Sequence, residues 1–129
     1  MRLQKQDLIN YRLEKSSITF QEAKALSQSG FWGGAANRLY YSCFYAVIAL
    51  LVKDDINAST HNGVRNEFFK FYIKTGVLDK RFVSLYSNLM SNRQESDYSD
   101  FHDFSREEIL PLFDEVEIFL TTLQGLINR

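Results

Sequence analysis

The sequence predicts an all-α protein: an antiparallel, up-and-down bundle of about five helices. Apolar residues recur at spacings of three and four in several segments, the period of a helix that covers a core. The connections between these segments are short, and none of the segments alternates apolar and polar residues as a half-buried strand would. Only six glycines and one proline occur in 129 residues, so we expect one ordered domain over residues 1–129.

We expect the first helix from about Asp7 to Ser27, with Gly30 after its end. One face of this helix carries small and apolar side chains at alternating spacings of four and three: Ile9, Leu13, Ser16, Phe20 and Ala23. That spacing indicates a helix with one buried side.

The second helix should follow the two glycines of a Gly-Gly-Ala-Ala tract at residues 33–36, whose alanines let another helix approach closely. From Leu39 to Val52 every residue except Ser42 is apolar. Arg38 and Lys53 limit this run to 14 residues, whereas a membrane span needs about 20. We therefore expect no membrane association and a central helix that touches several others.

The third helix should begin after the polar loop 53–59, with Thr60 as its N-cap and Gly76 as its stop. Its buried side is expected to carry Val64, Phe68 and Phe71.

Asp79 is the expected cap of the fourth helix. The inner stripe of this helix consists of Phe82, Leu85, Tyr86 and Leu89. Acids and aromatic residues alternate from Asp97 to Asp103, and we expect an ordered loop there.

The last helix is predicted from a capping box, Ser105 to Glu108. Pro111 has no N–H to donate, so the helix should kink there or begin nearer Ile109. Beyond Pro111 a stripe with helical spacing follows: Phe113, Val116, Leu120, Leu123 and Ile127.

Charge and composition limit the classes of function. A net charge of −1 and a pI of about 6.1 provide no overall attraction to nucleic acid, so any RNA contact must be local. The lone Cys43 suits a reducing compartment, and residues 1–10 are too polar for a secretion signal, so we expect a cytoplasmic protein. Because no Cys or His cluster and no glycine-rich phosphate loop occurs, we expect no metal and no cofactor.

Arg93 is the first candidate for chemistry. It lies four residues after Leu89 and eight after Leu85, so it continues the inner stripe of the fourth helix. A buried guanidinium needs an anion, because leaving such a charge unpaired costs about 3–5 kcal/mol. The anion is either a carboxylate, Asp97 or Glu95, in a structural ion pair, or a phosphate bound in a bidentate way.

Asn37 and Arg38 lie in the first turns of the second helix, where free N–H groups and the helix dipole favour an anion. The structural alternative is that Asn37 bonds a neighbouring helix and Arg38 faces water. Of the two histidines, His61 is expected in the first turn of the third helix. His102 is either a general acid or base, with an ordinary pKa near 6.5, or a surface residue without a role.

Residues 34–46, GAANRLYYSCFYA, resemble the second-helix signature of short, stand-alone HEPN proteins, Ala-x-x-Arg-x-Tyr-Tyr. Later segments match that family in the same order: HNGV at 61–64, KTGVL at 74–78, and Arg-x-x-x-Asp-Tyr from Arg93 to Tyr98. The resemblance covers about Asp7 to Leu126.

This resemblance implies a helical bundle that commonly dimerises, with a polar cleft at the dimer interface. It also implies a role near nucleotides, either as the partner of a minimal nucleotidyltransferase in a toxin–antitoxin pair or as a metal-independent endoribonuclease. The ribonuclease members carry Arg, four to six residues, then His. Here Tyr98 follows Arg93 after four residues and His102 after eight. A tyrosine, with a pKa near 10, is a poor general base at neutral pH.

Three functions therefore remain, and we rank the first of them highest. The first is a HEPN homodimer that binds a nucleotide or a partner without turnover, through these ligand-binding residues: Asn37, Arg38, Tyr41, Arg93 and Asp97. The second is an endoribonuclease with Arg93, Tyr98 and His102 as catalytic residues. The third is a bundle whose polar residues are structural; we rank it above the ribonuclease on charge alone and below the binding module because Arg93 faces inward.

Overall fold

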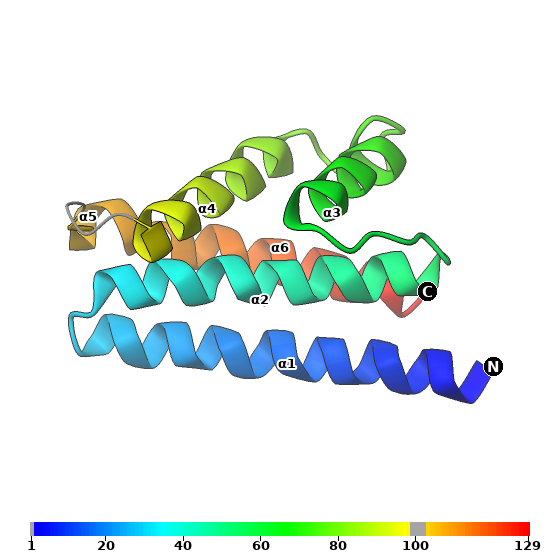
Figure 1. Cartoon of the computed structure of the whole chain (residues 1–129), viewed down its shortest axis with the longest axis horizontal. Helices are drawn as coiled ribbons and strands as arrows, with labels where there is room; N and C mark the ends of the chain where they lie inside the picture. Colours follow the sequence, from blue (N-terminus) through cyan, green and yellow to red (C-terminus); the bar gives the residue numbers. More distant parts are fainter. Residues whose placement is uncertain (1, 99–102) are drawn as a thin grey trace.

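The computed structural model describes the backbone of residues 2–98 and 103–129, and the side chains of residues 4–97 and 103–129. Helices account for its regular structure: α1 (Arg2–Gln28), α2 (Trp32–Lys53), α3 (His61–Phe68), the π-helix η1 (Phe69–Ile73), α4 (Arg81–Tyr98), α5 (Arg106–Ile109) and α6 (Leu112–Ile127). The described residues contain no strand, so the predicted all-α class is confirmed. As Figure 1 shows, α1 and α2 form a long antiparallel hairpin, with α6 behind α2 and with α3 and α4 above it.

Helix α2 is the centre of the bundle. It contacts α1, α4 and α6 most extensively, and it also touches α3 and α5. Its length and composition would allow it to cross a membrane, but 61% of its most apolar 18-residue window is buried inside the fold. That burial fits the central core helix that the sequence predicted.

The start of α2 differs from the prediction. The helix begins at Trp32, so Gly33 and Gly34 lie within its first turn instead of preceding it. Gly30 makes the turn from α1 with a positive φ of 79°. A Cβ on Gly34 would lie 3.2 Å from the Leu26 side chain, so this glycine lets the two helices approach closely.

The N-cap of α3 is as predicted, because Thr60 Oγ1 accepts a hydrogen bond from the Gly63 amide at 2.9 Å. Phe71, however, is 41% exposed, whereas Tyr72 and Ile73 are buried. The π-helical turn explains this error: Lys74 donates to the Phe69 carbonyl five residues back, and the extra residue rotates the following side chains out of the 3.6-residue phase.

Helix α4 carries the predicted inner stripe. Asp79 Oδ1 accepts from the Arg81 amide at 2.8 Å, and Phe82, Leu85, Tyr86 and Leu89 are all buried. The helix continues through Asp97 and Tyr98, so the prediction that a loop begins at Asp97 is wrong. Contacts from this last turn to α2 hold it: Ser96 donates to the Gly33 carbonyl at 3.0 Å, and Asn37 donates to Asp97. Residues 99–102 of the predicted loop lie outside the described residues.

The last helical region divides at Pro111, as the missing N–H predicted. Ser105 Oγ accepts from the Glu108 amide at 3.2 Å and caps α5, which ends at Ile109 before α6 begins at Leu112. In α6 the predicted Val116, Leu123 and Ile127 are buried, and so is Phe119, which the predicted stripe omitted.

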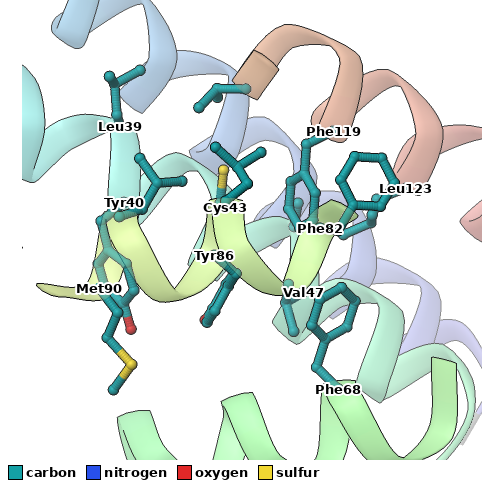
Figure 2. Close-up of a cluster of buried hydrophobic side chains, with 14 of the residues drawn as sticks. Leu39, Tyr40, Cys43, Val47, Phe68, Phe82, Tyr86, Met90, Phe119 and Leu123 are labelled. Atoms are coloured by element: carbon teal, nitrogen blue, oxygen red, sulfur yellow. The ribbon is translucent and has the colours of Figure 1, made fainter. Parts of the chain in front are cut away.

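The ring of Phe119 lies at the centre of the core, where it joins α6 to α3 and α4 (Figure 2). Its centroid lies 5.8 Å from that of Phe68, 5.1 Å from that of Phe82 and 6.3 Å from that of Tyr86. The same aromatic group also supports Tyr40, because the centroid of the Tyr86 ring lies 5.8 Å from that of the Tyr40 ring.

Replacing Phe119 with alanine should lower the free energy of unfolding by about 3–5 kcal/mol, because it leaves a cavity among three rings. Ile118→Ala is the matched control: Ile118 precedes Phe119 in the chain and is 45% exposed, so we expect a change within about 0.5 kcal/mol. Urea denaturation followed by circular dichroism measures both. Equal losses in the two variants would contradict this packing.

Candidate functional site

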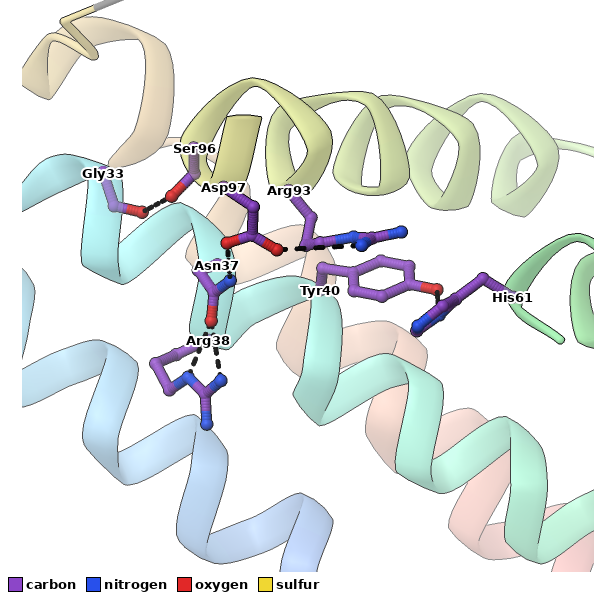
Figure 3. Close-up of polar contacts among 8 residues, drawn as sticks. All are labelled: Gly33, Asn37, Arg38, Tyr40, His61, Arg93, Ser96 and Asp97. Carbon is purple, nitrogen blue, oxygen red and sulfur yellow. Dashed lines mark hydrogen bonds and ion pairs between the residues drawn. The ribbon is translucent and has the colours of Figure 1, made fainter. Parts of the chain in front are cut away.

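Polar side chains from three helices form a row of contacts along the first half of α2, from the end of α4 at Ser96 and Asp97 to the start of α3 at His61 (Figure 3). We call this group the polar cluster; it consists of Asn37, Arg38, Tyr40, His61, Arg93, Ser96 and Asp97. Helix α4 brings its residues here because its inner stripe packs on α2, and α3 does so because its N-terminal turn faces the same part of α2.

Arg93 is buried in this cluster, with 6% of its surface exposed. Its Nη1 lies 3.7 Å from Asp97 Oδ2, and its Cζ lies 5.3 Å from the centroid of the Tyr40 ring. The first distance indicates an ion pair without a hydrogen bond, because N–H···O bonds span about 2.7–3.2 Å. Its Nε is also buried, with no hydrogen-bond partner among the described residues. The guanidinium is therefore stabilised electrostatically but incompletely hydrogen-bonded.

Asp97 is held by α2. Asn37 donates to Asp97 Oδ1 at 2.8 Å, and the amide oxygen of Asn37 accepts from Nε and Nη2 of Arg38 at 2.9 and 2.7 Å. Arg38 also lies 3.6 Å from Glu22 of α1. Asn37 therefore bonds a neighbouring helix, as one of the two interpretations of the sequence expected. Arg38 is half-buried, with its Cζ 5.1 Å from the Tyr41 ring centroid, so it does not simply face water.

His61 is a member of the cluster that the sequence did not select. Its Nδ1 and the Tyr40 hydroxyl lie 2.7 Å apart. Its ring lies 4.6 Å from that of Phe44 and 5.8 Å from that of Tyr41, centroid to centroid. Only its place at the start of α3 and the HNGV match were visible in the sequence, because its partner Tyr40 lies 21 residues away on another helix.

Burial sets the protonation states of this pair. Burial, followed by the nearby positive charge of Arg93, lowers the pKa of His61 from its ordinary value of 6.5, and Asp97 opposes that shift. Burial raises the pKa of Tyr40 to about 12. At neutral pH we therefore expect a neutral imidazole beside a protonated hydroxyl.

The structure brings together the five residues predicted to bind a ligand: Asn37, Arg38, Tyr41, Arg93 and Asp97. For the predicted catalytic set only Arg93 can be placed fully. Tyr98 ends α4, but its side chain and the whole of His102 lie outside the described residues. Within residues 2–98 and 103–129 no group of three or more His, Cys, Asp or Glu side chains is arranged to hold a metal ion.

Comparison with known proteins gives a family and several relatives. A profile of the HEPN domain matches residues 9–126. The chain is 30% identical to a UPF0332 protein of Thermotoga maritima, over 97% of this chain and 95% of that protein. It is 35% identical to a protein of Methanocaldococcus jannaschii named "Putative toxin MJ0142", over 91% of this chain and 80% of that protein. A UPF0332 protein of Archaeoglobus fulgidus is 24% identical over 95% of this chain and 98% of its own length.

The lowered pKa of His61 predicts how stability depends on pH. Below pH 6.5 the unfolded chain takes up a proton at this residue more readily than the folded chain, so the folded state loses stability as the pH falls. His61→Gln removes this contribution. Urea denaturation from about pH 7.5 to about 5.5 should therefore show the wild type losing stability relative to the variant. A difference between the two proteins that stays constant with pH would contradict the assignment.

Proposed function

Because this chain belongs to the HEPN domain family, we propose that it is a toxin-like module that binds a nucleotide phosphate at Arg93 without efficiently cleaving RNA. The other ligand that the same guanidinium could take is an acidic group of a protein partner.

The observation that carries the proposal is the incomplete bonding of Arg93. The residue is 6% exposed, its ion pair with Asp97 is 3.7 Å long, and its Nε has no partner among the described residues. A buried donor without an acceptor costs about 1–3 kcal/mol, and more when it is charged. A phosphate offers several oxygens to the planar guanidinium and would supply the missing acceptors.

Asp97 supports this function by holding Arg93 in place. One of its oxygens accepts from Asn37, so the carboxylate is shared between α2 and α4. It therefore offsets the buried charge without satisfying all of the guanidinium donors. In this proposal Asn37, Arg38 and Tyr41 form the side of the site that α2 contributes.

The wider assignment rests on the family and its relatives. Two proteins of Methanocaldococcus jannaschii that this chain resembles are named as putative toxins. We propose a cytoplasmic protein that pairs with a minimal nucleotidyltransferase, as many HEPN proteins do.

We also propose a homodimer, because several large apolar side chains are exposed, among them Tyr11 at 54%, Ile18 at 50% and Phe31 at 62%. Light scattering that gives a monomer mass at micromolar concentration would contradict the dimer.

Arg93→Gln should weaken nucleotide binding at least tenfold while changing the free energy of unfolding by less than about 1.5 kcal/mol. The control is Arg81→Gln, because Arg81 begins the same helix and is exposed there. Calorimetric titration with AMP, and with an acidic peptide in parallel, measures affinity. A stability loss of several kcal/mol with unchanged affinity for both ligands would instead make Arg93 a purely structural partner of Asp97.

Purified alone in the presence of a metal chelator, the protein should leave a mixed RNA pool intact. Positioned acid–base catalysis is worth about 10²–10⁴ in rate, but it needs a group with a pKa near the working pH, which a tyrosine at position 98 lacks. Arg93→Ala, Tyr98→Phe and His102→Ala are assayed beside the wild type. Cleavage that both Arg93→Ala and His102→Ala abolish would make this a ribonuclease, and cleavage lost only in Tyr98→Phe would make the tyrosine chemically active.

A further inference from the structure

We propose that His61 is a second ligand-binding residue of this site and donates a hydrogen bond from Nε2 to the phosphate held by Arg93. This inference rests on the proposed function and extends it. It assigns the site a neutral donor on α3 in addition to the guanidinium on α4.

The position of His61 is fixed from several sides. It is the first residue of α3, and its backbone is anchored by the Thr60 cap one residue before it. Phe44 and Tyr41 of α2 pack against its ring, and Nδ1 is held by the Tyr40 hydroxyl. A histidine held in this way has little freedom to turn, whereas Nε2 has no hydrogen bond to another described residue.

The contact with Tyr40 involves Nδ1, which accepts from the hydroxyl in one tautomer of the imidazole and donates to it in the other. A neutral imidazole has one donor and one acceptor nitrogen. Because burial raises the pKa of Tyr40 to about 12, its hydroxyl keeps its proton and can donate it to Nδ1. In that arrangement Nε2 carries the hydrogen of the imidazole and faces away from Tyr40 as a donor.

Tyr40 also links His61 to Arg93. The guanidinium lies over the face of the Tyr40 ring, and His61 meets the hydroxyl at the end of the same ring. In Figure 3 the Arg93 side chain extends over Tyr40 toward α3. The buried Nε of Arg93 lacks a partner, and the positive end of the α3 dipole lies at His61, so each of these two residues favours an anion beside it.

The charged groups near His61 indicate how a bound phosphate would change its pKa. Arg93 and Asp97 of α4 are the charges that act on its titration, and Tyr40 and Tyr41 of α2 pack against it. A bound phosphate dianion would add to the negative charge of Asp97 and offset the positive charge of Arg93. The pKa of His61 should therefore rise when the site is filled.

Two variants separate the donor of His61 from its packing. His61→Phe keeps an aromatic ring among Tyr40, Tyr41 and Phe44 but has no donor, whereas His61→Gln keeps an amide donor. We expect His61→Phe to weaken binding of AMP at least fivefold and His61→Gln to retain most of the affinity. Inorganic phosphate and a short single-stranded RNA are titrated in parallel to show whether a free phosphate, a nucleotide or a polynucleotide is bound most tightly.

Arg93→Gln in the same titrations distinguishes the two proposals. If it loses affinity while both His61 variants bind like the wild type, His61 is not a ligand residue and the proposed function stands. If all three variants and the wild type fail to bind phosphate, AMP and RNA, the proposed function itself is wrong, and this inference with it.

Nitrogen-15 NMR of the wild-type imidazole tests the inference without depending on a variant that folds. We expect the Nε2–H tautomer in the free protein and an upward shift of the His61 pKa when AMP is added. A hydrogen on Nδ1, or a pKa that does not change at saturating AMP, would overturn the inference. Tyr40→Phe should weaken the preference for the Nε2–H tautomer, because Nδ1 then loses its hydrogen-bond partner.

Discussion

The buried guanidinium of Arg93, lying over the Tyr40 ring, is the interaction on which the rest of this site depends. Arg93 is 6% exposed, and a charged side chain buried to this extent is tolerated only if its surroundings offset the loss of hydration. Three helices supply the groups that do so. Helix α4 supplies the carboxylate of Asp97, and α2 supplies both Asn37, which orients that carboxylate, and the ring of Tyr40. Helix α3 supplies His61, which holds the hydroxyl of the same tyrosine. These side chains therefore hold one another in position around Arg93. The Nε donor of Arg93 nevertheless has no hydrogen-bond acceptor among the described residues.

The bundle keeps this cluster rigid because α2 is buried along most of its length. Ala35 and Ala36 are almost fully buried, and a Cβ on Gly34 would meet the Leu26 side chain, so the N-terminal half of α2 tolerates little change in volume. The Tyr40 ring, over which the guanidinium lies, packs against Tyr86 of the aromatic core (Figure 2). Tyr86 in turn packs against Phe68, Phe69 and Phe119. Tyr40 therefore belongs both to the hydrophobic core and to the polar cluster.

Helical periodicity predicted much of this arrangement, because it is a local property of the chain. The spacing of Leu85, Leu89 and Arg93 was sufficient to place the arginine on the buried face of α4, and Thr60 and Ser105 were recognisable as caps. The errors have non-local or irregular causes. Phe71 is exposed because of a π-helical turn, and Asp97 remains helical because α2 bonds the last turn of α4. His61 was not selected because its contacts with Tyr40 and Phe44 exist only after α3 folds back on α2.

If the unsatisfied donors of Arg93 receive a phosphate, the contact should change the resonance of its Nε–H, which side-chain proton–nitrogen NMR observes directly. The signal is assigned by its loss in Arg93→Lys, and Arg12 of α1, whose Nε is also buried without a described partner, is an internal control in the same spectrum. We predict that titration with AMP shifts the Arg93 Nε–H resonance saturably and leaves that of Arg12 unchanged. An Arg93 resonance that does not shift at saturating nucleotide would contradict phosphate binding at Arg93. The guanidinium would then serve only the structural ion pair with Asp97.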